Sequence, residues 1–525
     1  MFLALLTILL AAVTADFAYD HHKLRVSEVT MSGYDVAATR DFPSTLRAKD
    51  VANLRVHWNV SQCGGAVSPP IIKNGRTCST DYAGCISCYN TVTGTLLWRK
   101  NVSEYNLPNR IYSRTIAYSS GMILFVTAGI IGNRTGYGTW LVAVDFYTTD
   151  LVWKTQLSSS IWTTGTSNPL VVDGFVYVGL SSSESAGVLT PGHVCCETVS
   201  KMLEVRLRNG DITMTVPSFP LELSGVGKYS GGSIWGQLAY HKDHLYYGTG
   251  QLYQAPNASA ECAAANPQNT SCVPPLVRFD SIIKLEVARG RPGRGGIVAS
   301  VRTQASDTWN VACLITSIPG CQPGPALDYD VTNLIISVDT NQLFGTAKSG
   351  VVWALDLDTL ALNWIDFTVQ GYIYGGYIYQ GALRDNKDKS KLRLVLSNNN
   401  GGRYNFTLLN GTVVNTGLWL ALDGNGNKVW TTGVPGGGAL GDTAFAGVAI
   451  TNDVVVAATR YEGLIALLNL DTGAILRTIS TGGSMSSTPS IGRDGGIYYA
   501  CGAGSLALSF NRPLKVQSHF IKIAP

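Results

Sequence analysis

The most distinctive chemical group in this chain is a pair of adjacent cysteines, Cys195 and Cys196. Neighbouring cysteines are rarely left as two free thiols, and a disulfide between them is a strained and reactive one. We therefore expect a disulfide or a functional pair. The pair lies in one of three loops that are long for β connections, at 184–198, 251–280 and 305–332. Long loops on a rigid β scaffold are where function usually sits.

The other cysteines indicate a structural framework. The chain has 11 cysteines, and in an oxidising compartment most of them should pair. Cys262 with Cys272, and Cys313 with Cys321, each bracket one short loop. We expect these two pairs to be disulfides.

A second close pair, Cys85 and Cys88, has the C-x-x-C spacing. Tyr89 follows it, so the sequence lacks the C-x-x-C-H of a haem attachment. A zinc site would need a second C-x-x-C or paired histidines, and neither is present. We expect Cys85 and Cys88 to be strand residues, with a disulfide to Cys63 or Cys78.

Several enzyme and binding classes are excluded by missing motifs. The chain has neither H-E-x-x-H nor G-x-S-x-G. The basic glycine loop at 290–296 lacks the G-K-[ST] ending of a phosphate-binding loop. A formal charge of +4 over 525 residues predicts neither nucleic-acid nor membrane binding.

The element that must position these groups is a repeated strand–turn–strand phrase. In VVWALDLDTLALNW, at 351–364, the side chains alternate in polarity on both sides of a turn near Asp358 and Thr359. Related phrases recur at 88–98, 141–153, 202–214, 282–301, 419–430 and 464–477. Such recurrence is typical of a β-propeller, in which each small sheet buries its faces against its neighbours.

Counting the ends of these phrases predicts eight blades, with seven as the alternative. The ends are Trp58, Trp98, Trp153, Met214, Val301, Trp364, Trp430 and Arg477. We expect the tryptophans to pack between blades. A lone early strand at 54–60 and three late strands, at 484–492, 496–500 and 505–509, would together complete one four-stranded blade and close the ring.

These patterns predict one all-β propeller domain at 51–525, preceded by an arm at 16–50 that wraps the body. Residues 1–15 have the apolar run and the Val13-Thr14-Ala15 ending of a signal peptide. Seven N-x-S/T sequons follow, at Asn59, Asn101, Asn133, Asn257, Asn269, Asn405 and Asn410. We expect a secreted glycoprotein.

The eightfold A-x-D-x-x-T-G-x-x-x-W type repeat resembles that of quinoprotein alcohol dehydrogenase-like propellers, which bind pyrroloquinoline quinone (PQQ). Segments 232–252, 305–330 and 346–356 are similar to the polyvinyl-alcohol-dehydrogenase-like branch of that family. The resemblance covers nearly the whole mature chain. It implies PQQ and Ca²⁺ as cofactors and a small-molecule or polymeric alcohol as substrate.

The resemblance also assigns cofactor-binding residues. Trp235 matches the tryptophan that stacks on the quinone, and Cys195-Cys196 matches the vicinal disulfide beside it. Lys348 matches the basic residue that polarises the quinone carbonyl, and Arg114 matches a basic residue near the quinone carboxylates. Trp235 as a packing residue and Lys348 as an ordinary turn lysine remain alternatives.

The metal and catalytic positions depart from the family pattern. Glu184 matches a calcium-ligating glutamate, with a solvated surface glutamate as the alternative. Gln251 stands where the family has an asparagine ligand, and Asn310 stands at the catalytic aspartate. Asn310 cannot accept a proton from an alcohol, and a Glu–Gln–Asn set offers Ca²⁺ only one negative charge. Asp307 would serve as the base if its loop is rearranged.

Two functions therefore remain from the sequence. One is a secreted, PQQ-dependent oxidoreductase acting on alcohol groups. The other is a glycosylated binding or scaffold propeller that has lost the chemistry, which the residues Gln251 and Asn310 favour. A carbohydrate-active propeller is a third and weaker hypothesis, because it needs facing carboxylates that a sequence cannot show.

Overall fold

The repeated phrase forms the two outer strands of each sheet. In the phrase at 351–364 these are β24 (Val351–Asp356) and β25 (Leu362–Phe367). The Asp356 carboxylate closes the turn by accepting the backbone N–H groups of Asp358 and Thr359, at 3.1 and 2.8 Å. This local bonding explains why an Asp–Thr turn recurs between the strands.

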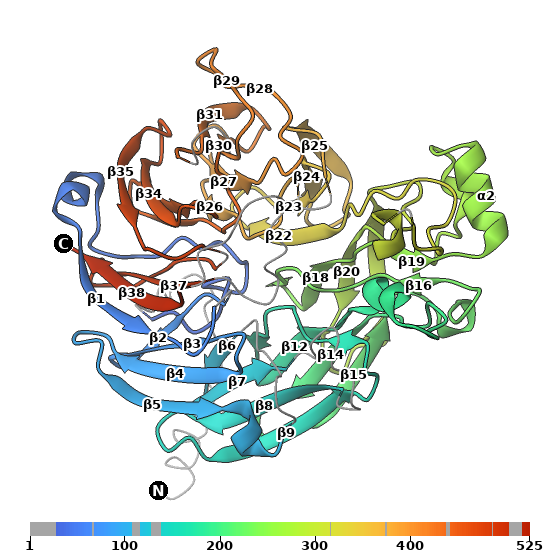
Figure 1. Cartoon of the computed structure of the whole chain (residues 1–525), viewed down its shortest axis with the longest axis horizontal. Helices are drawn as coiled ribbons and strands as arrows, with labels where there is room; N and C mark the ends of the chain where they lie inside the picture. The colour runs from blue at the N-terminus through green and yellow to red at the C-terminus, as the bar shows by residue number, and fades with distance from the viewer. Residues whose placement is uncertain are drawn as a thin grey trace, which may run out of the picture.

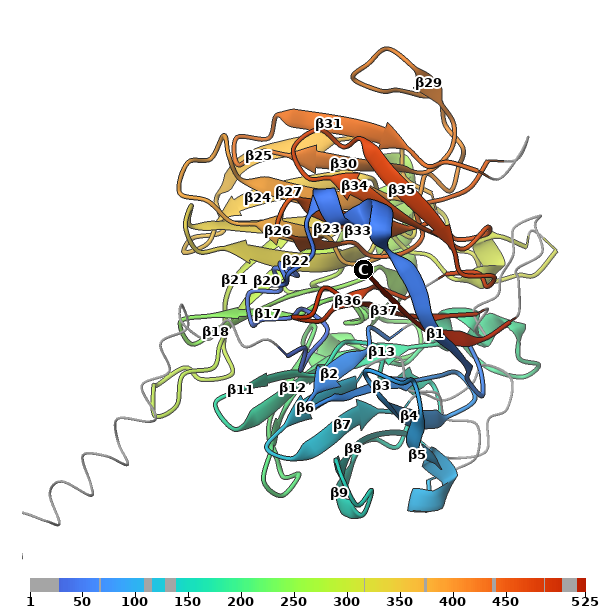
Figure 2. The same cartoon turned by 90° about the vertical axis from the view of Figure 1, so that its left-hand side faces the viewer.

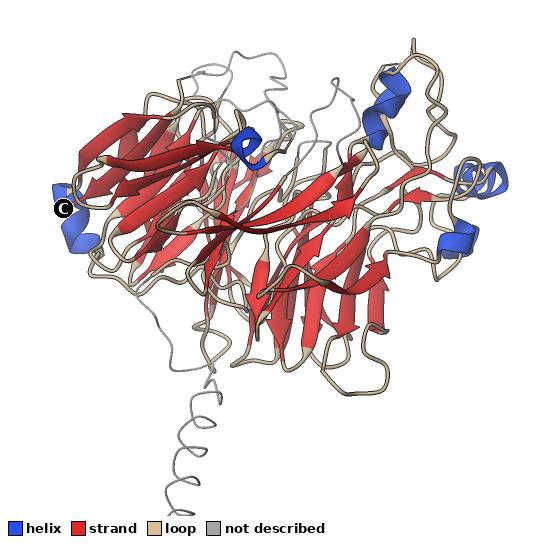
Figure 3. Cartoon of the chain, turned by 90° about the horizontal axis from the view of Figure 1, so that it is seen from below, coloured by secondary structure: helices blue, strands red, loops and turns tan. Residues whose placement is uncertain are grey.

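The computed structural model describes residues 28–65, 68–107, 116–127, 138–315, 317–372, 375–436, 441–485, 487–502 and 517–525. Within them, eight four-stranded antiparallel sheets stand around a central axis (Figure 1), which confirms the predicted eight-bladed propeller. Strands fill the body, and the few helices lie at its edges (Figure 3).

Seven blades are built from consecutive strands, written here from the inner to the outer strand. The first three are β2 (Ile71–Lys73), β3 (Arg76–Thr80), β4 (Cys85–Asn90) and β5 (Leu96–Asn101); β6 (Ile116–Ser119), β7 (Met122–Val126), β8 (Thr139–Asp145) and β9 (Leu151–Ser158); β11 (Leu170–Val172), β12 (Phe175–Gly179), β14 (Lys201–Arg206) and β15 (Ile212–Pro217). The next four are β17 (Ala239–His241), β18 (His244–Gly248), β20 (Ser281–Glu286) and β21 (Ile297–Arg302); β22 (Val331–Ser337), β23 (Gln342–Ala347), β24 and β25; β26 (Ala382–Arg384), β27 (Arg393–Asn398), β30 (Leu418–Leu422) and β31 (Lys428–Gly433); β32 (Ala449–Thr451), β33 (Val454–Ala458), β34 (Leu464–Asn469) and β35 (Ile475–Ser480).

Short elements decorate the loops between these strands. The two-stranded sheets are β10 (Thr163–Thr164) with β13 (Ser181–Ser182), β16 (Ser230–Gly231) with β19 (Leu252–Gln254), and β28 (Phe406–Thr407) with β29 (Val413–Val414). The helices are η1 (Ala48–Asn53), η2 (Val102–Tyr105), η3 (Glu184–Leu189), η4 (Leu221–Leu223), α2 (Asn257–Ala265), η5 (Thr270–Cys272) and η6 (Val311–Cys313).

The eighth blade joins the two ends of the chain. Its order is β1 (Arg55–Ser61), β38 (His519–Ala524), β37 (Ile497–Cys501) and β36 (Ser490–Ile491), as Figure 2 shows. The predicted closure by the termini is therefore plausible in this form, but its third late strand is β38. The expected strand at 505–509 lies outside the described residues, and so do the predicted signal peptide 1–15 and Arg114.

The repeat tryptophans dock each blade onto the next one, as predicted. The indole N–H of Trp430 donates to the Leu470 carbonyl at 2.8 Å, and that of Trp153 donates to the Leu207 carbonyl at 2.9 Å. Trp58, Trp98 and Trp364 make the same bond to the carbonyls of Thr91, Phe146 and Gly424.

Four of these indoles rest directly on a glycine of the neighbouring turn. A Cβ atom at Gly94, Gly210, Gly426 or Gly473 would overlap the ring of Trp58, Trp153, Trp364 or Trp430, respectively. Each glycine also has a positive φ, between 67° and 89°. The T-G turn and the tryptophan of the preceding blade are thus two halves of one contact.

The N-terminal segment lies against the inner strands of the ring. Its carbonyls and N–H groups from Val29 to Phe42 bond to six inner-strand residues, namely Ile72, Tyr118, Tyr240, Ile336, Leu383 and Ile450. Arg40 is fully buried and donates to the Val448 carbonyl at 2.9 Å and to the Ser32 and Pro489 carbonyls. For its described part, the arm therefore runs along the inner strands instead of wrapping the outside.

The cysteine predictions are confirmed. The structure has the bridges Cys63–Cys85, Cys78–Cys88, Cys195–Cys196, Cys262–Cys272 and Cys313–Cys321. The remaining cysteine, Cys501, is buried as a free thiol. Among the described helices, none combines the length and apolar character needed to cross a membrane.

Replacing Gly473 by Ala should separate the docking contact from simple backbone strain. Both Gly473 (φ 67°) and Gly75 (φ 70°) have left-handed backbones, but nothing lies within 4 Å of a Cβ at Gly75. We expect Gly75→Ala to cost about 1 kcal/mol of unfolding free energy. Gly473→Ala should cost about 1–3 kcal/mol more, because the methyl group pushes the Trp430 ring away. Denaturant unfolding of both variants measures the difference, and equal losses would contradict the docking argument.

Candidate functional site

The three long loops identified in the sequence come together on one side of the ring. They carry η3, α2 and η6 and lie over the blades of β11–β15 and β17–β21 (Figure 1). Leu252 forms a β-bridge to Thr308, and Val199 forms one to Gly231. The loops thus form one connected layer above the sheets.

This layer encloses a cavity of about 670 Å³ between η3 and η6. Its wall mixes apolar groups, such as Val188 and Ile318, with the polar side chains of His193, Tyr253 and Asn310. Cys195 also lines it. Of the residues predicted for the site, Cys195 and Asn310 are therefore the two that face this cavity.

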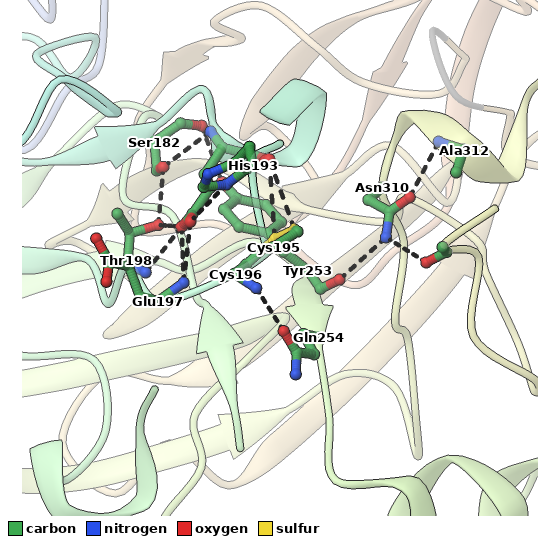
Figure 4. The surroundings of a disulfide bond; sticks show 12 residues. Ser182, His193, Cys195, Cys196, Glu197, Thr198, Tyr253, Gln254, Asn310 and Ala312 are labelled. Atoms are coloured by element: carbon green, nitrogen blue, oxygen red, sulfur yellow. Dashed lines mark hydrogen bonds and ion pairs between the residues drawn. A yellow bond between two sulfur atoms is a disulfide. The ribbon is translucent and has the colours of Figure 1, made fainter. Parts of the chain in front are cut away.

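The vicinal disulfide forms one edge of the cavity (Figure 4). Cys195 and Cys196 are bridged and joined by a cis peptide bond. The Cys196 N–H donates to the side-chain oxygen of Gln254. Both sulfurs lie against the Glu184 carbonyl oxygen, at 3.9 and 3.8 Å. The sequence therefore predicted correctly that these cysteines pair, next to the glutamate.

Glu184 is fully buried at the start of η3. Its Oε1 and Oε2 atoms lie 3.0 and 3.1 Å from the Glu197 N–H. Oε2 also accepts the Thr198 N–H at 2.8 Å and the Thr198 hydroxyl at 2.5 Å. The alternative of a solvated surface glutamate is wrong, because this carboxylate is bound by the loop that carries the disulfide.

His193 is the site residue that sequence reasoning missed. Its Nε2 lies 3.2 Å from Glu184 Oε1, at ion-pair distance but without the straight N–H geometry of a hydrogen bond. Its ring packs on Trp162, with 4.4 Å between ring centroids. The one available signal was its position in the same long loop as Glu184, since the chain offers no histidine motif around it.

Asn310 caps the short helix η6. Its Oδ1 accepts the Ala312 N–H at 3.0 Å. Its Nδ2 donates to the carbonyls of Gly320 and Tyr253, at 2.9 and 3.3 Å. An aspartate in this place would face two carbonyl oxygens, so the local structure selects the amide over the carboxylate.

Asp307 has no exposed surface and serves as an anchor for a loop. Its carboxylate accepts the N–H groups of Leu327 and Tyr329 at 2.8 Å and that of Asp328 at 3.2 Å. Burial raises the pKa of Asp307 to about 6, although these backbone bonds oppose the rise. A carboxylate held in this way is not placed to meet a substrate, which argues against Asp307 as the replacement base.

Asp280 faces Asp307 from the start of β20. Burial, and then the negative charges of Asp307 and Asp330, raise the pKa of Asp280 well above its ordinary value. Neither of its carboxyl oxygens has a hydrogen-bond donor among the described residues. A proton held between the two acids accounts for this arrangement.

Lys348 lies between two further aspartates and a tryptophan. Its Nζ is 2.7 Å from Asp328 Oδ1 and 2.5 Å from Asp330 Oδ2, and 5.4 Å from the ring centroid of Trp235. Burial alone would lower the pKa of Lys348, but the two carboxylates raise it above its ordinary value. Lys348 is therefore a fixed cation beside a half-buried indole.

Gln251 joins this group through its backbone, because its N–H donates to Asp330 Oδ1 at 3.0 Å. The preceding residue must be glycine, since a Cβ at Gly250 would overlap that same oxygen. Tyr253 links the two parts of the site. Its hydroxyl donates to the Ser182 carbonyl at 3.0 Å, and the charges of Asp330, Glu184 and Lys348 all act on its pKa, which burial raises.

Comparisons with known proteins agree with this architecture. The family model PQQ_2, described as outer membrane protein assembly factor BamB, matches residues 27–186. A polyvinylalcohol dehydrogenase from a Pseudomonas species is 24% identical over 204 residues, which is 36% of this chain and 30% of that protein. This chain therefore matches less than a third of the length of that relative.

Solved structures show the same fold over almost the whole chain. A europium-containing methanol dehydrogenase superposes with a TM-score of 0.64 at 16% identity, covering 95% of this chain and 98% of that one. Quinohemoprotein alcohol dehydrogenases from Pseudomonas putida and Comamonas testosteroni give TM-scores of 0.67 and 0.64 at 15% and 16% identity. Each covers 95% of this chain and 80% of its own. The predicted resemblance to quinoprotein alcohol dehydrogenase-like propellers is confirmed.

Replacing Asp280 by Asn should change how stability depends on pH. The folded protein holds the Asp280 proton to a higher pH than the unfolded chain does, so unfolding releases it as pH rises above about 4. Stability of the native protein must therefore fall with increasing pH through this window. Asn keeps a donor toward Asp307 and removes this loss.

The test compares melting temperatures between pH 4 and pH 8. The advantage of Asp280→Asn over the native chain should grow as pH rises, by a few degrees. Replacing the exposed Asp471 by Asn is the control and should leave the profile unchanged. Parallel profiles for native and Asp280→Asn proteins would show that the Asp280 pKa is ordinary.

Proposed function

We propose that this chain is a secreted quinoprotein that uses PQQ to oxidise alcohol groups. The observation that carries the proposal is the Lys348 ammonium held 5.4 Å from the Trp235 ring. A cation beside an aromatic face suits a planar, anionic quinone. The similarity to proteins named alcohol dehydrogenases supports the same chemistry.

The residues around Lys348 fit such a cofactor. The Ser349 hydroxyl, next in sequence, is buried and has no hydrogen-bond partner in the described chain. Trp235, Lys348 and Ser349 would hold the quinone, and the disulfide would border it. When bound, the quinone supplies a two-electron acceptor for the alcohol. The protein supplies the stacking surface, the fixed charge and a site shielded from water by the loop layer.

The residues at the metal positions do not fit Ca²⁺. Both oxygens of Glu184 are bonded by backbone and hydroxyl donors. The Asn310 amide is committed to three hydrogen bonds that hold η6 and its neighbours. Calcium needs several oxygen ligands directed at one point, and these two side chains are turned to other partners.

Asn310 also supports a second candidate function, a binding propeller without turnover. Because its amide is a structural cap, substituting aspartate would set a negative charge against the carbonyls of Tyr253 and Gly320. We therefore expect Asn310→Asp to lower the melting temperature without creating activity. Quinone binding without alcohol-dependent dye reduction would favour this second function.

The primary test adds PQQ to the purified chain and follows tryptophan fluorescence and alcohol-dependent dye reduction. Trp235→Leu removes the aromatic face and should weaken quinone binding by about tenfold, or about 1.4 kcal/mol. Trp235→Phe retains a ring and should stay within about twofold of the native affinity. Equal affinities for native, Leu and Phe proteins, or no binding at all, would overturn the assignment of Trp235 and Lys348.

A further inference from the structure

The carboxylate of Glu184 is enclosed on all sides that the structure describes. Backbone donors from Glu197 and Thr198 and the Thr198 hydroxyl take up its oxygens, and the side chain has no exposed surface. The remaining approach, from the cavity, is covered by the ring of His193, whose Nε2 lies 3.2 Å from Oε1.

The position of His193 is built into its surroundings. Trp162 supports one side of the ring. Gly187 leaves the space for it, because a Cβ there would lie 2.7 Å from His193 Cδ2 and 2.9 Å from Nε2. The glycine of η3 is therefore needed for the histidine to reach the glutamate.

We infer that the His193 ring takes the place of a metal ion next to Glu184, so that this site works without a divalent cation. A metal ligated by Glu184 would have to displace the imidazole and at least one donor from Thr198. It would also have to take the Asn310 oxygen from the Ala312 N–H. The inference builds on the proposed function, since it concerns the cofactor set of the same site.

Terbium binding tests the inference directly, because Tb³⁺ replaces Ca²⁺ at oxygen sites and is excited by nearby tryptophan, here Trp162. For the native full-length chain we expect no saturable terbium luminescence and no change of melting temperature with Ca²⁺ or EDTA. His193→Ala uncovers Glu184 and should bind terbium at least about tenfold more tightly than the native chain. Adding Glu184→Gln to that variant should abolish the gain.

Two further variants keep the result decisive. Gly187→Ala displaces the ring without deleting it and should shift terbium binding in the same direction as His193→Ala. His244→Ala breaks a different histidine–glutamate pair, with Glu286 at 3.6 Å, and should change nothing. Saturable terbium binding by the native chain that Glu184→Gln removes would overturn the inference. So would the absence of binding in both His193→Ala and Gly187→Ala.

Quinone binding is measured on the same samples in EDTA. If the native chain fails to bind quinone, the proposed function fails while the terbium result still decides the role of His193. If it binds quinone in EDTA and also shows Glu184-dependent terbium binding, the proposed function stands and the inference about His193 fails.

Discussion

The docking of a tryptophan on a glycine of the next blade is the contact on which the ring depends. A four-stranded sheet has two apolar faces and cannot cover either one alone. The indole covers part of the boundary between blades, and its N–H donates to a carbonyl of the neighbouring turn, as Trp430 does to Leu470. At the last boundary Arg477 substitutes for the tryptophan and donates to the Val51 and Ala52 carbonyls of η1. The ring therefore closes with the same geometry but different chemistry.

The rigid ring allows the loops above it to hold polar groups that would otherwise be costly to bury. Glu184, Asp280, Asp307 and Lys348 are all largely removed from solvent. Each is held by a neighbouring charge, a shared proton or several backbone donors, as burial of ionisable groups requires. The N-terminal segment adds to this rigidity on the inner strands, where Arg40 satisfies carbonyls of separate blades.

The site shows how two departures from a family pattern can be understood together. Asn310 and Gln251 each weaken a calcium site, and His193 covers the one carboxylate that remains. In this structure the three features have a common effect, because the oxygens that would surround a metal are bonded within the protein. The cation and the aromatic face that suit a quinone, Lys348 and Trp235, are retained.

The sequence by itself determined the eight-bladed ring, the role of the tryptophans and all five disulfides up to the partners of Cys85 and Cys88. These depend on short, repeated patterns: period-two strands, Asp–Thr turns and cysteines that bracket a loop. The last strand was misplaced, since β38 follows a long segment and carries no repeat phrase.

Only the tertiary structure decided the chemistry of the site. His193 reaches Glu184, and Asp280 faces Asp307, because loops from different blades meet above the ring. Whether an asparagine is a ligand or a helix cap, as at Asn310, depends on which carbonyls surround its amide. Those partners lie far apart along the chain, so no local pattern records them.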